Sequence, residues 1–194
     1  MIAGLILSAG ESRRMGRDKA LLTYYGRTFL ATILGNLIAA GMARVTVVLG
    51  HHAEIIQEEV DLAAARVVVN HQYARGQTSS LQAGLAAALA DFPEAIVLCL
   101  VDHPAISAGV IAIVKAEFES SHPLVVIPTH QGQRGHPILI NHALFAELLA
   151  LPPEQPANAV IRKYRHATRF VEVSDPGVLL DVDNPTTYEQ LGSR

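Results

Sequence analysis

Continuous apolar runs alternate along the chain with stretches in which apolar residues recur every three or four positions. The run at 2–8 is short and ends in small residues, which is typical of a buried strand. The stretch 28–40 is apolar at positions 30, 33, 34, 37 and 38, the spacing of one helix face, and Gly41 marks its end. These patterns predict strands over 2–8, 44–49, 65–69, 95–101, 124–128, 137–140 and 169–173. They predict helices over 28–40, 53–60, 79–90, 107–118, 141–150, 158–164 and 185–191.

This alternation predicts an α/β fold. Strands that are apolar throughout are buried on both faces, so we expect a mostly parallel sheet between two helix layers, a three-layer α/β/α arrangement. The segment 124–140 is the exception, because the residues between its two runs are too few for a crossover helix. We expect a hairpin or wide turn there, and hence a mixed sheet with an antiparallel strand. The Pro-rich stretch 151–156 is interpreted as a loop within one domain, 1–194, because the chain after it is too short to bury a core.

The composition is that of an ordinary globular chain. Half of the 194 residues are hydrophobic, 17% are charged and the net charge is −3, which argues against a nucleic-acid coat. The one cysteine, Cys99, lies in an apolar run, so no intrachain disulfide is possible, as expected in a reducing cytoplasm. The first apolar run lacks a basic leader and meets charge after about ten residues, so we interpret it as a core strand and not a signal peptide. No run reaches the roughly 18 apolar residues of a membrane span, and we expect a cytoplasmic protein without membrane contact.

The most informative segment follows the first predicted strand, where the chain enters a glycine-containing basic loop. Gly10 and Gly16 let backbone N–H groups approach an anion, and four of the seven residues from 13 to 19 are Lys or Arg. The loop is not a Walker loop, since its glycines are one residue too far apart and Ala20 follows Lys19, and it does not read G-x-G-x-x-G. An ordinary surface loop with solvated arginines is the alternative, but the position directly after a strand favours a phosphate site.

Acidic residues occur at two further points. Asp102 directly follows the run 96–101, at the strand end where open α/β sheets bind ligands, although it could instead cap the next helix. If the chain is extended at Asp181 and Asp183, alternation puts both carboxylates on one face, where they can share a cation. Asn184 is a candidate cap for the last helix. Carboxylate oxygens are the ligands that Mg²⁺ prefers, so the sequence predicts a magnesium site.

Two polar motifs have both functional and structural interpretations. Ser79 and Ser80 open a predicted helix and can hold a ribose or phosphate, or simply cap the helix. Arg134 and His136 can present a cation and an imidazole to a substrate, or form a turn before proline. The nine histidines include no H-E-x-x-H motif, and the pair at 51–52 is expected on an exposed loop, so a structural zinc site is disfavoured.

These landmarks together resemble the nucleotidyltransferases of the molybdenum-cofactor family, and their cytidylyltransferase branch in particular. The family opens with L-A-A-G-x-S-x-R-M-G-x-x-K, and residues 7–19 depart from this motif only in having Ser8 for alanine. The resemblance covers essentially the whole chain. It continues through Gly76-Gln77-Thr78-Ser79-Ser80-Leu81, Val101-Asp102-His103-Pro104 (the family often has Gln in place of His103), Arg134-Gly135-His136-Pro137 and Asp181-Val182-Asp183-Asn184-Pro185.

The resemblance implies a fold of the nucleotide-diphospho-sugar transferase type with a Rossmann-like nucleotide-binding half. It implies transfer of a nucleoside monophosphate from a triphosphate to a phosphate group, with release of pyrophosphate. By this analogy Lys19, Arg13 and Asp102 act in catalysis, while Asp102 and Asp183 hold Mg²⁺. Arg134 and His136 would meet the acceptor. The nucleotide would lie against Leu7, Ser8, Ala9, Gly10, Ser12, Arg13, Gly16, Lys19, Ser79 and Ser80.

The resemblance also suggests substrates. Ala9 favours CTP, because guanylyltransferases of the family tend to have L-A-G-G at this point, and molybdopterin or molybdenum cofactor is the implied acceptor, with a molybdoenzyme or its chaperone receiving the product. A phosphate acceptor is already an anion near neutral pH, so no strong base is needed. Three alternatives stay open: a sugar phosphate or other alcohol phosphate as acceptor, a nucleotide-binding regulatory or chaperone-like module without turnover, and a glycosyltransferase with Asp181 and Asp183 as its metal motif.

Overall fold

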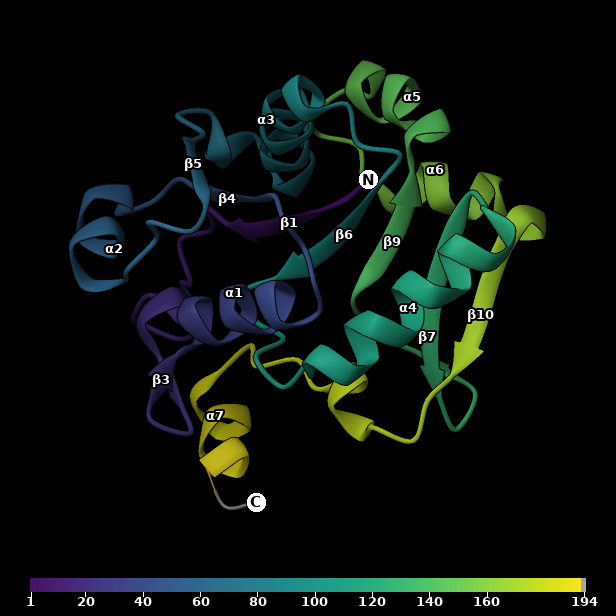
Figure 1. Cartoon of the computed structure of the whole chain (residues 1–194). Helices are drawn as coiled ribbons and strands as arrows, with labels where there is room; N and C mark the ends of the chain where they lie inside the picture. The colour runs from purple at the N-terminus through teal and green to yellow at the C-terminus, as the bar shows by residue number, and fades with distance from the viewer. Residues whose placement is uncertain (193–194) are drawn as a thin grey trace.

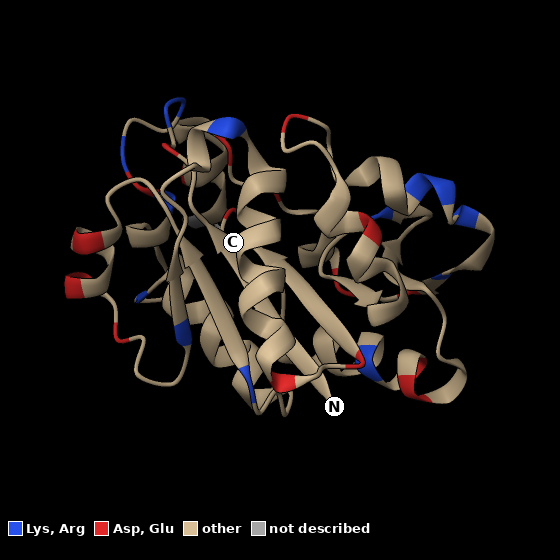
Figure 2. Cartoon of the chain, turned by 90° about the horizontal axis from the view of Figure 1, so that it is seen from above, with Lys and Arg blue, Asp and Glu red and all other residues tan. Residues whose placement is uncertain are grey.

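The computed structural model describes residues 1–192, which fold around one mixed sheet (Figure 1). The sheet has eight strands in the order β10-β7-β9-β6-β1-β4-β5, with the short β8 paired to β7. Figure 2 shows few charged residues on the central strands, whereas most lie on helices and loops around them. The predicted mixed, mostly parallel α/β sheet is therefore confirmed.

The parallel half of the sheet is the half that reaches the site. It consists of β1 (Ile2–Ser8), β4 (Val45–Leu49), β5 (Arg66–Val69) and β6 (Ala95–Leu100). β1 lies between β4 and β6, and every residue of β1 and β4 is buried, as their apolar sequences require. Because parallel strands end at the same edge, the loops that follow β1, β4 and β6 meet there.

The antiparallel half contains the predicted reversal. β7 (Val125–His130) turns through Gln131 and Gly132, both at positive φ, into β8 (Gln133–Arg134). β9 (Ile138–Asn141) then inserts antiparallel between β6 and β7, and β10 (Thr168–Glu172) runs parallel to β7 at the edge. The small β2 (Thr23–Tyr24) and β3 (Arg27–Thr28) hairpin, outside the sheet, was not predicted.

Helices cover both faces, so the predicted three layers are confirmed. On one face α1 (Phe29–Ala39), α2 (Ala53–Glu59) and α4 (Ala108–Ser121) share a core with Ile2 and Ile6 of β1. On the other, α3 (Gln77–Ala88), α5 (Phe145–Ala150) and α6 (Asn158–Lys163) pack with Leu5 and Leu7. Figure 1 shows α3 and α5 on one side of β1 and α1 on the other. In the described part of the chain, no helix has the length and apolarity to cross a bilayer.

The ends of the helices show which polar residues are structural. Thr28 and Ser107 cap α1 and α4 through their hydroxyls, and Asn184 accepts a bond from Thr187 N at the start of α7 (Pro185–Gly192). The interpretation of Ser79 or Ser80 as a cap is wrong, because α3 begins earlier than the predicted start at 79, after Gly76 at φ 114°. Short 3₁₀ turns complete the chain at Lys19–Leu21, Tyr73–Arg75, Leu89–Asp91, His142–Leu144, Arg165–Ala167 and Pro176–Leu179.

One glycine brings α3 unusually close to the sheet. A Cβ at Gly84 would lie 2.5 Å from Leu5 Cδ1 and 2.7 Å from Val48 Cγ2, both on fully buried side chains. The helix can therefore settle directly onto β1 and β4 only because this position has no side chain. The close contact holds the first turn of α3 beside the ends of those strands.

Candidate active site

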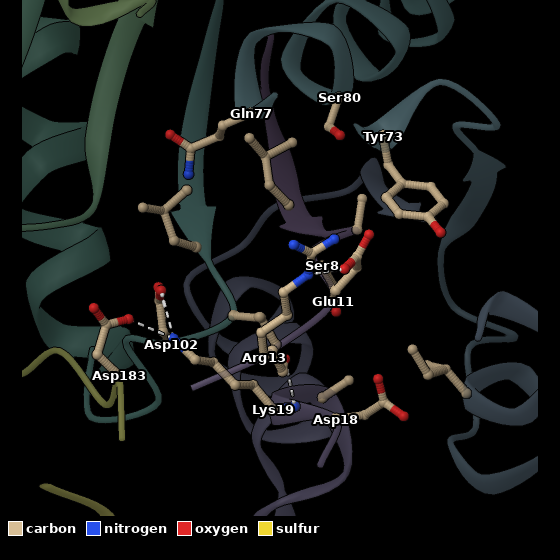
Figure 3. Close-up of a pocket in the computed structure, with 18 of the residues that line it drawn as sticks. Ser8, Glu11, Arg13, Asp18, Lys19, Tyr73, Gln77, Ser80, Asp102 and Asp183 are labelled. Atoms are coloured by element: carbon tan, nitrogen blue, oxygen red, sulfur yellow. Dashed lines mark hydrogen bonds and ion pairs between the residues drawn. The ribbon is translucent and has the colours of Figure 1, made fainter. Parts of the chain in front are cut away.

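A cavity of about 540 Å³ opens at the carboxyl edge of the parallel strands, within the size range of small-molecule sites. The end of β1, the loop after it, the start of α3 and the end of β6 form its walls (Figure 3). Most predicted site residues line it: Leu7, Ser8, Ala9, Gly10, Ser12, Arg13, Lys19, Ser80, Asp102 and Asp183. Gly16, Ser79, Arg134 and His136 do not.

Ser12 holds the loop after β1 in a closed turn. Its carbonyl accepts hydrogen bonds from Met15 N at 2.9 Å and Gly16 N at 3.1 Å, and its hydroxyl accepts from Lys19 N at 3.2 Å. Ser12 itself has φ 51° and Gly16 has φ 73°. These bonds fold residues 12–19 back toward the strand end and place Lys19 at the cavity. Gly16 thus shapes the loop from outside the cavity.

The end of β4 supports the same loop through Gly50, which sequence analysis did not single out. A Cβ at Gly50 would lie 2.6 Å from the carbonyl oxygen of Ala9, and the next residue, His51, donates its N–H to that oxygen at 3.2 Å. The two backbones touch, so any larger residue at 50 would displace the loop. A glycine directly after a strand is the sequence signal that indicates such an approach.

Lys19 is the cation at the centre of the site. Its ammonium lies 2.6 Å from Asp183 Oδ1 and 3.2 Å from Asp102 Oδ2, and its side chain is only 11% exposed (Figure 3). Arg14 contacts the other Asp183 oxygen at 2.9 Å. The hydrogen bond and charge of Lys19, with a smaller effect of Arg14, hold the pKa of the Asp183 carboxyl below its ordinary value. Ion pairs of Lys19 and Arg14 with Asp102 and Asp183 therefore connect the loop to the end of β6 and to the segment before α7.

Arg13 is an exposed cation on the wall of the cavity. Its guanidinium hydrogen-bonds the carboxylate of Glu11, a residue that sequence analysis missed, and this bond lowers the pKa of Glu11. Figure 3 shows the two side chains together beside Ser8. Because Arg13 is exposed and, among residues 1–192, its ion pair is with a neighbour in its own loop, an anionic ligand can exchange for Glu11.

The two serines at the start of α3 share one hydrogen-bond partner, the side chain of Asn70. Asn70 donates its side-chain amide to Ser79 Oγ at 2.9 Å and to Ser80 Oγ at 3.0 Å. The Ser79 hydroxyl also donates a hydrogen bond of 2.8 Å to the carbonyl oxygen of Gly76. Ser80 faces the cavity, whereas Ser79 is tied to the backbone that precedes α3.

A second group of side chains gathers beside Lys19. Asp102, His103 and Asp181 each place one ligand atom within 4.8 Å of the others. Burial, together with the charges of Asp102 and Asp183, raises the pKa of Asp181, while burial lowers the pKa of His103 and favours a neutral imidazole. The sequence predicted Asp102, Asp181 and Asp183 as carboxylates for a cation, and the resemblance implied Asp102 and Asp183 as its ligands. In the structure Lys19 bonds both Asp102 and Asp183, Arg14 bonds Asp183, and Asp181 and His103 lie close to Asp102.

This group suits a divalent cation. Within residues 1–192, Asp102 Oδ1 and His103 Nδ1 are buried without a hydrogen-bond partner. A buried acceptor without a partner is costly, and a cation would satisfy the carboxylate oxygen. Two carboxylates and an imidazole are established donors for divalent metals.

The two predicted acceptor residues lie elsewhere. Arg134, on β8, is exposed and stacks its guanidinium over the Phe170 ring at 4.8 Å. His136 is half-buried, with its ring 4.3 Å from that of His103. Burial, with a smaller effect of the neighbouring His103, lowers the pKa of His136 to about 4. Neither residue lines the cavity: His136 lies against the His103 ring, and Arg134 lies against the Phe170 ring.

The histidine pair after β4 borders the cavity from another side. His52 Nδ1 lies 2.9 Å from Asp18 Oδ2, His51 Nδ1 lies 3.2 Å from the Tyr73 hydroxyl, and the two rings are 3.7 Å apart. Asp18 and Tyr73 both line the cavity, one from the loop and one from the segment before α3. The pair links these two walls, which the expectation of an exposed loop had not anticipated.

A basic glycine loop faces carboxylates at the carboxyl edge of a mixed α/β sheet, and the fold is that of the nucleotide-diphospho-sugar transferases. The chain belongs to the MobA-like NTP transferase domain family, which matches residues 4–168. The resemblance stated from the sequence is thereby confirmed. Proteins of this family bind nucleoside triphosphates and phosphate-bearing substrates and use divalent metals.

Two relatives and two solved structures match this chain over nearly its full length. A nicotine blue oxidoreductase of Paenarthrobacter nicotinovorans is 30% identical over 98% of this chain and 94% of its own. The molybdenum cofactor cytidylyltransferase of Escherichia coli K12 is 24% identical over 95% of this chain and 92% of its own. The crystal structure of Rv0371c from Mycobacterium tuberculosis H37Rv is 28% identical, has a TM-score of 0.86, and covers 100% of this chain and 97% of its own. The structure of the same mycobacterial protein in complex with manganese is 27% identical in sequence, has a TM-score of 0.79, and covers 98% of this chain and 97% of its own.

Proposed function

We propose that this protein transfers a nucleoside monophosphate, most readily CMP from CTP, to the phosphate of a molybdopterin-type acceptor and releases pyrophosphate. The observation that carries the proposal is the convergence of Lys19, Asp102 and Asp183 under a glycine-containing basic loop in one cavity. Residues 1–194 would form a single functional domain in the cytoplasm, and a molybdoenzyme or its chaperone would receive the product.

The proposed reaction needs alignment and charge neutralisation more than proton transfer. An acceptor phosphate oxygen attacks the α-phosphorus, the bond from that phosphorus to the bridging oxygen breaks, and pyrophosphate leaves with the electron pair. Lys19 and Arg13 would neutralise the phosphates, with Lys19 already fixed by Asp102 and Asp183. A divalent ion, Mg²⁺ in the simplest case, would be held by Asp102 with Asp183 or Asp181 and would stabilise charge on the phosphate oxygens.

The geometry refines the roles proposed for the remaining residues. We place the nucleotide against Leu7, Ser8, Ala9, Gly10, Ser12 and Ser80, which line the cavity. Gly16 and Ser79 would act indirectly, because Gly16 turns the loop and the Ser79 hydroxyl is bound to the backbone of Gly76. Arg134 is exposed and is proposed to meet the acceptor, whereas His136 would act through His103.

Two observations support the choice of substrate and ion. Ala9 stands where the cytidylyltransferase branch has alanine, and the E. coli relative is a molybdenum cofactor cytidylyltransferase. The mycobacterial neighbour has been solved with manganese, which supports a divalent ion in this fold. The more identical relative is named an oxidoreductase, so the assay below measures pyrophosphate release, which distinguishes transfer from another use of the cavity.

Pyrophosphate release from each common nucleoside triphosphate, with molybdopterin, sugar phosphates and no acceptor, tests the proposal. We expect release with CTP and molybdopterin, and its loss in Asp102→Asn, because that change removes a charge from the site. Release with a sugar phosphate instead would keep the reaction and replace the acceptor. Tight nucleotide binding without pyrophosphate from any acceptor would reject transfer in favour of a non-catalytic nucleotide-binding module.

A further inference from the structure

The group formed by Asp102, His103 and Asp181 is built differently from a site made only of oxygen ligands. The imidazole of His103 belongs to a side chain that is only 9% exposed, and its Nε2 lies 3.9 Å from Asp102 Oδ1. Asp181 completes the group, with all three ligand atoms within 4.8 Å of one another. This distance is short enough for one ion to reach all three after small side-chain movements.

The two oxygens of Asp102 have different surroundings. Oδ2 accepts a hydrogen bond from Lys19, whereas Oδ1, which faces His103, is buried and finds no partner among the described residues. His103 Nδ1 is likewise buried and unbonded in that part of the chain. Buried polar atoms of native proteins are nearly all satisfied, so the unbonded Asp102 Oδ1, with His103 Nε2 at 3.9 Å, points to a missing ligand between these two atoms. Lys19 does not fill this place, because it already bonds the opposite oxygen.

The donor set indicates which ion. Mg²⁺ binds oxygen and dehydrates reluctantly, whereas imidazole nitrogen favours first-row transition-metal ions. We propose that Asp102, His103 and Asp181 bind a first-row divalent transition-metal ion in preference to Mg²⁺, and that His103 supplies the nitrogen ligand that makes this selection. The inference deepens the proposed function, because this ion would serve the transfer, but ion binding can be measured without nucleotide or acceptor.

His136 has the geometry of a support for this ligand. Its ring lies 4.3 Å from that of His103 at an interplanar angle of 33°, and its backbone N–H is bonded to the carbonyl of Val178 at 2.9 Å. A neighbouring ring held in this way restricts the rotation of the His103 imidazole. The ligand is therefore oriented before the ion arrives, which is how outer residues of metal sites act.

Titration of the whole, nucleotide-free protein with Mn²⁺, followed by electron paramagnetic resonance with Mg²⁺ as competitor, tests the inference. We expect one tightly bound Mn²⁺, retained against excess Mg²⁺, with nitrogen modulation in the spin-echo signal from a directly bonded imidazole. His103→Gln should abolish the modulation and weaken Mn²⁺ binding by about tenfold or more. It should change Mg²⁺ binding by less than about threefold, since the amide keeps an oxygen donor.

The matched control is His52→Gln, because His52 and Asp18 form the other histidine–carboxylate pair beside the cavity. It should leave both Mn²⁺ affinity and the nitrogen signal unchanged. A wild-type spectrum without imidazole coupling, a Mn²⁺ affinity no better than that for Mg²⁺, or a signal lost in His52→Gln would each overturn the inference. The wild-type spectrum decides even if His103→Gln fails to fold. Absent pyrophosphate release in the same protein would reject the proposed function and leave the ion site standing.

Discussion

Lys19 joins three segments that are far apart in the sequence. It follows the basic loop, and its ammonium bonds Asp102 at the end of β6 and Asp183 before α7. The motif at 7–19 predicted a lysine at the phosphates, and the acidic points predicted a cation between carboxylates. What the sequence did not predict is that this lysine is itself the cation between them. The hydrogen bond from Lys19 N to the Ser12 hydroxyl closes the loop and thereby sets the position of Lys19. This bond depends on the backbone geometry of the loop, which cannot be predicted from residue types.

Removing the Lys19 charge should slow the proposed transfer strongly. In Lys19→Met, which keeps the length of the side chain, we expect the rate of pyrophosphate release at saturating nucleotide to fall about 10²–10³-fold, because a fixed charge at the developing negative charge is lost. Lys19→Arg should recover part of the rate. The matched control is Arg17→Met, since Arg17 is a cation of the same loop that stacks on Tyr188 outside the cavity. Equal losses in both methionine variants would show that only the net charge of the loop matters.

The acidic residues show the limit of prediction from sequence. Asp102 and Asp183 were predicted from their positions after an apolar run and before a helix, and both line the cavity. Asp181 was predicted to share a cation with Asp183, but the segment around it is not a strand, so alternation does not describe where its side chain lies. No pattern in the sequence indicated His103 as a ligand. Only the fold brings residues 102–103 and 181 together. The roles of all these residues stay predictions.

Among the helices and strands, the long apolar ones were predicted and the short ones were not. β1, β4 and β6 were predicted because strands buried on both faces have continuous apolar sequences, without alternation of apolar and polar residues. The two-residue strands β2 and β3 are too short to carry any period, and no motif marks their turn. The insertion of β9 between β6 and β7 could not be predicted either, because strand order depends on packing between distant segments. The start of α3 was misplaced because the serines suggested a cap that Gly76 makes unnecessary.

The close packing of α3 can be tested with two valines. Gly84→Val should lower the free energy of unfolding by about 1–3 kcal/mol, because new atoms would overlap the buried Leu5 and Val48 side chains. Gly109→Val is the matched control: Gly109 lies in the first turn of α4, where a Cβ would meet only Ser107 Oγ at 3.8 Å. We expect a change of about 0.5 kcal/mol or less there, since valine and glycine differ little in helix propensity. Urea denaturation measures both, and equal effects would contradict the close approach of α3.

In the whole protein, the stacked pair of buried His103 and half-buried His136 links stability to pH. The pKa of His136 in the folded protein is about 4, below its ordinary value of 6.5, chiefly because burial disfavours the charged ring. Between these values the unfolded chain binds a proton at this residue that the folded protein does not. The free energy of unfolding must therefore fall as pH drops from about 6.5 toward 4, by up to about 1.4 kcal/mol per pH unit from this residue. Below the folded pKa both states are protonated, so the loss levels off.

Urea denaturation of the metal-free protein, with chelator present, at several pH values from 4 to 7 checks this expectation. His136→Gln should flatten the slope, because glutamine does not titrate, while His142→Gln replaces an exposed histidine and controls for the loss of a histidine as such. Since His103 is also buried and its pKa is also lowered, some slope should persist in His136→Gln. An unchanged slope in that variant would mean that His136 is protonated, or solvated, in the folded protein. The ring behind His103 would then not be the fixed neutral support that the close stacking of the two histidines indicates.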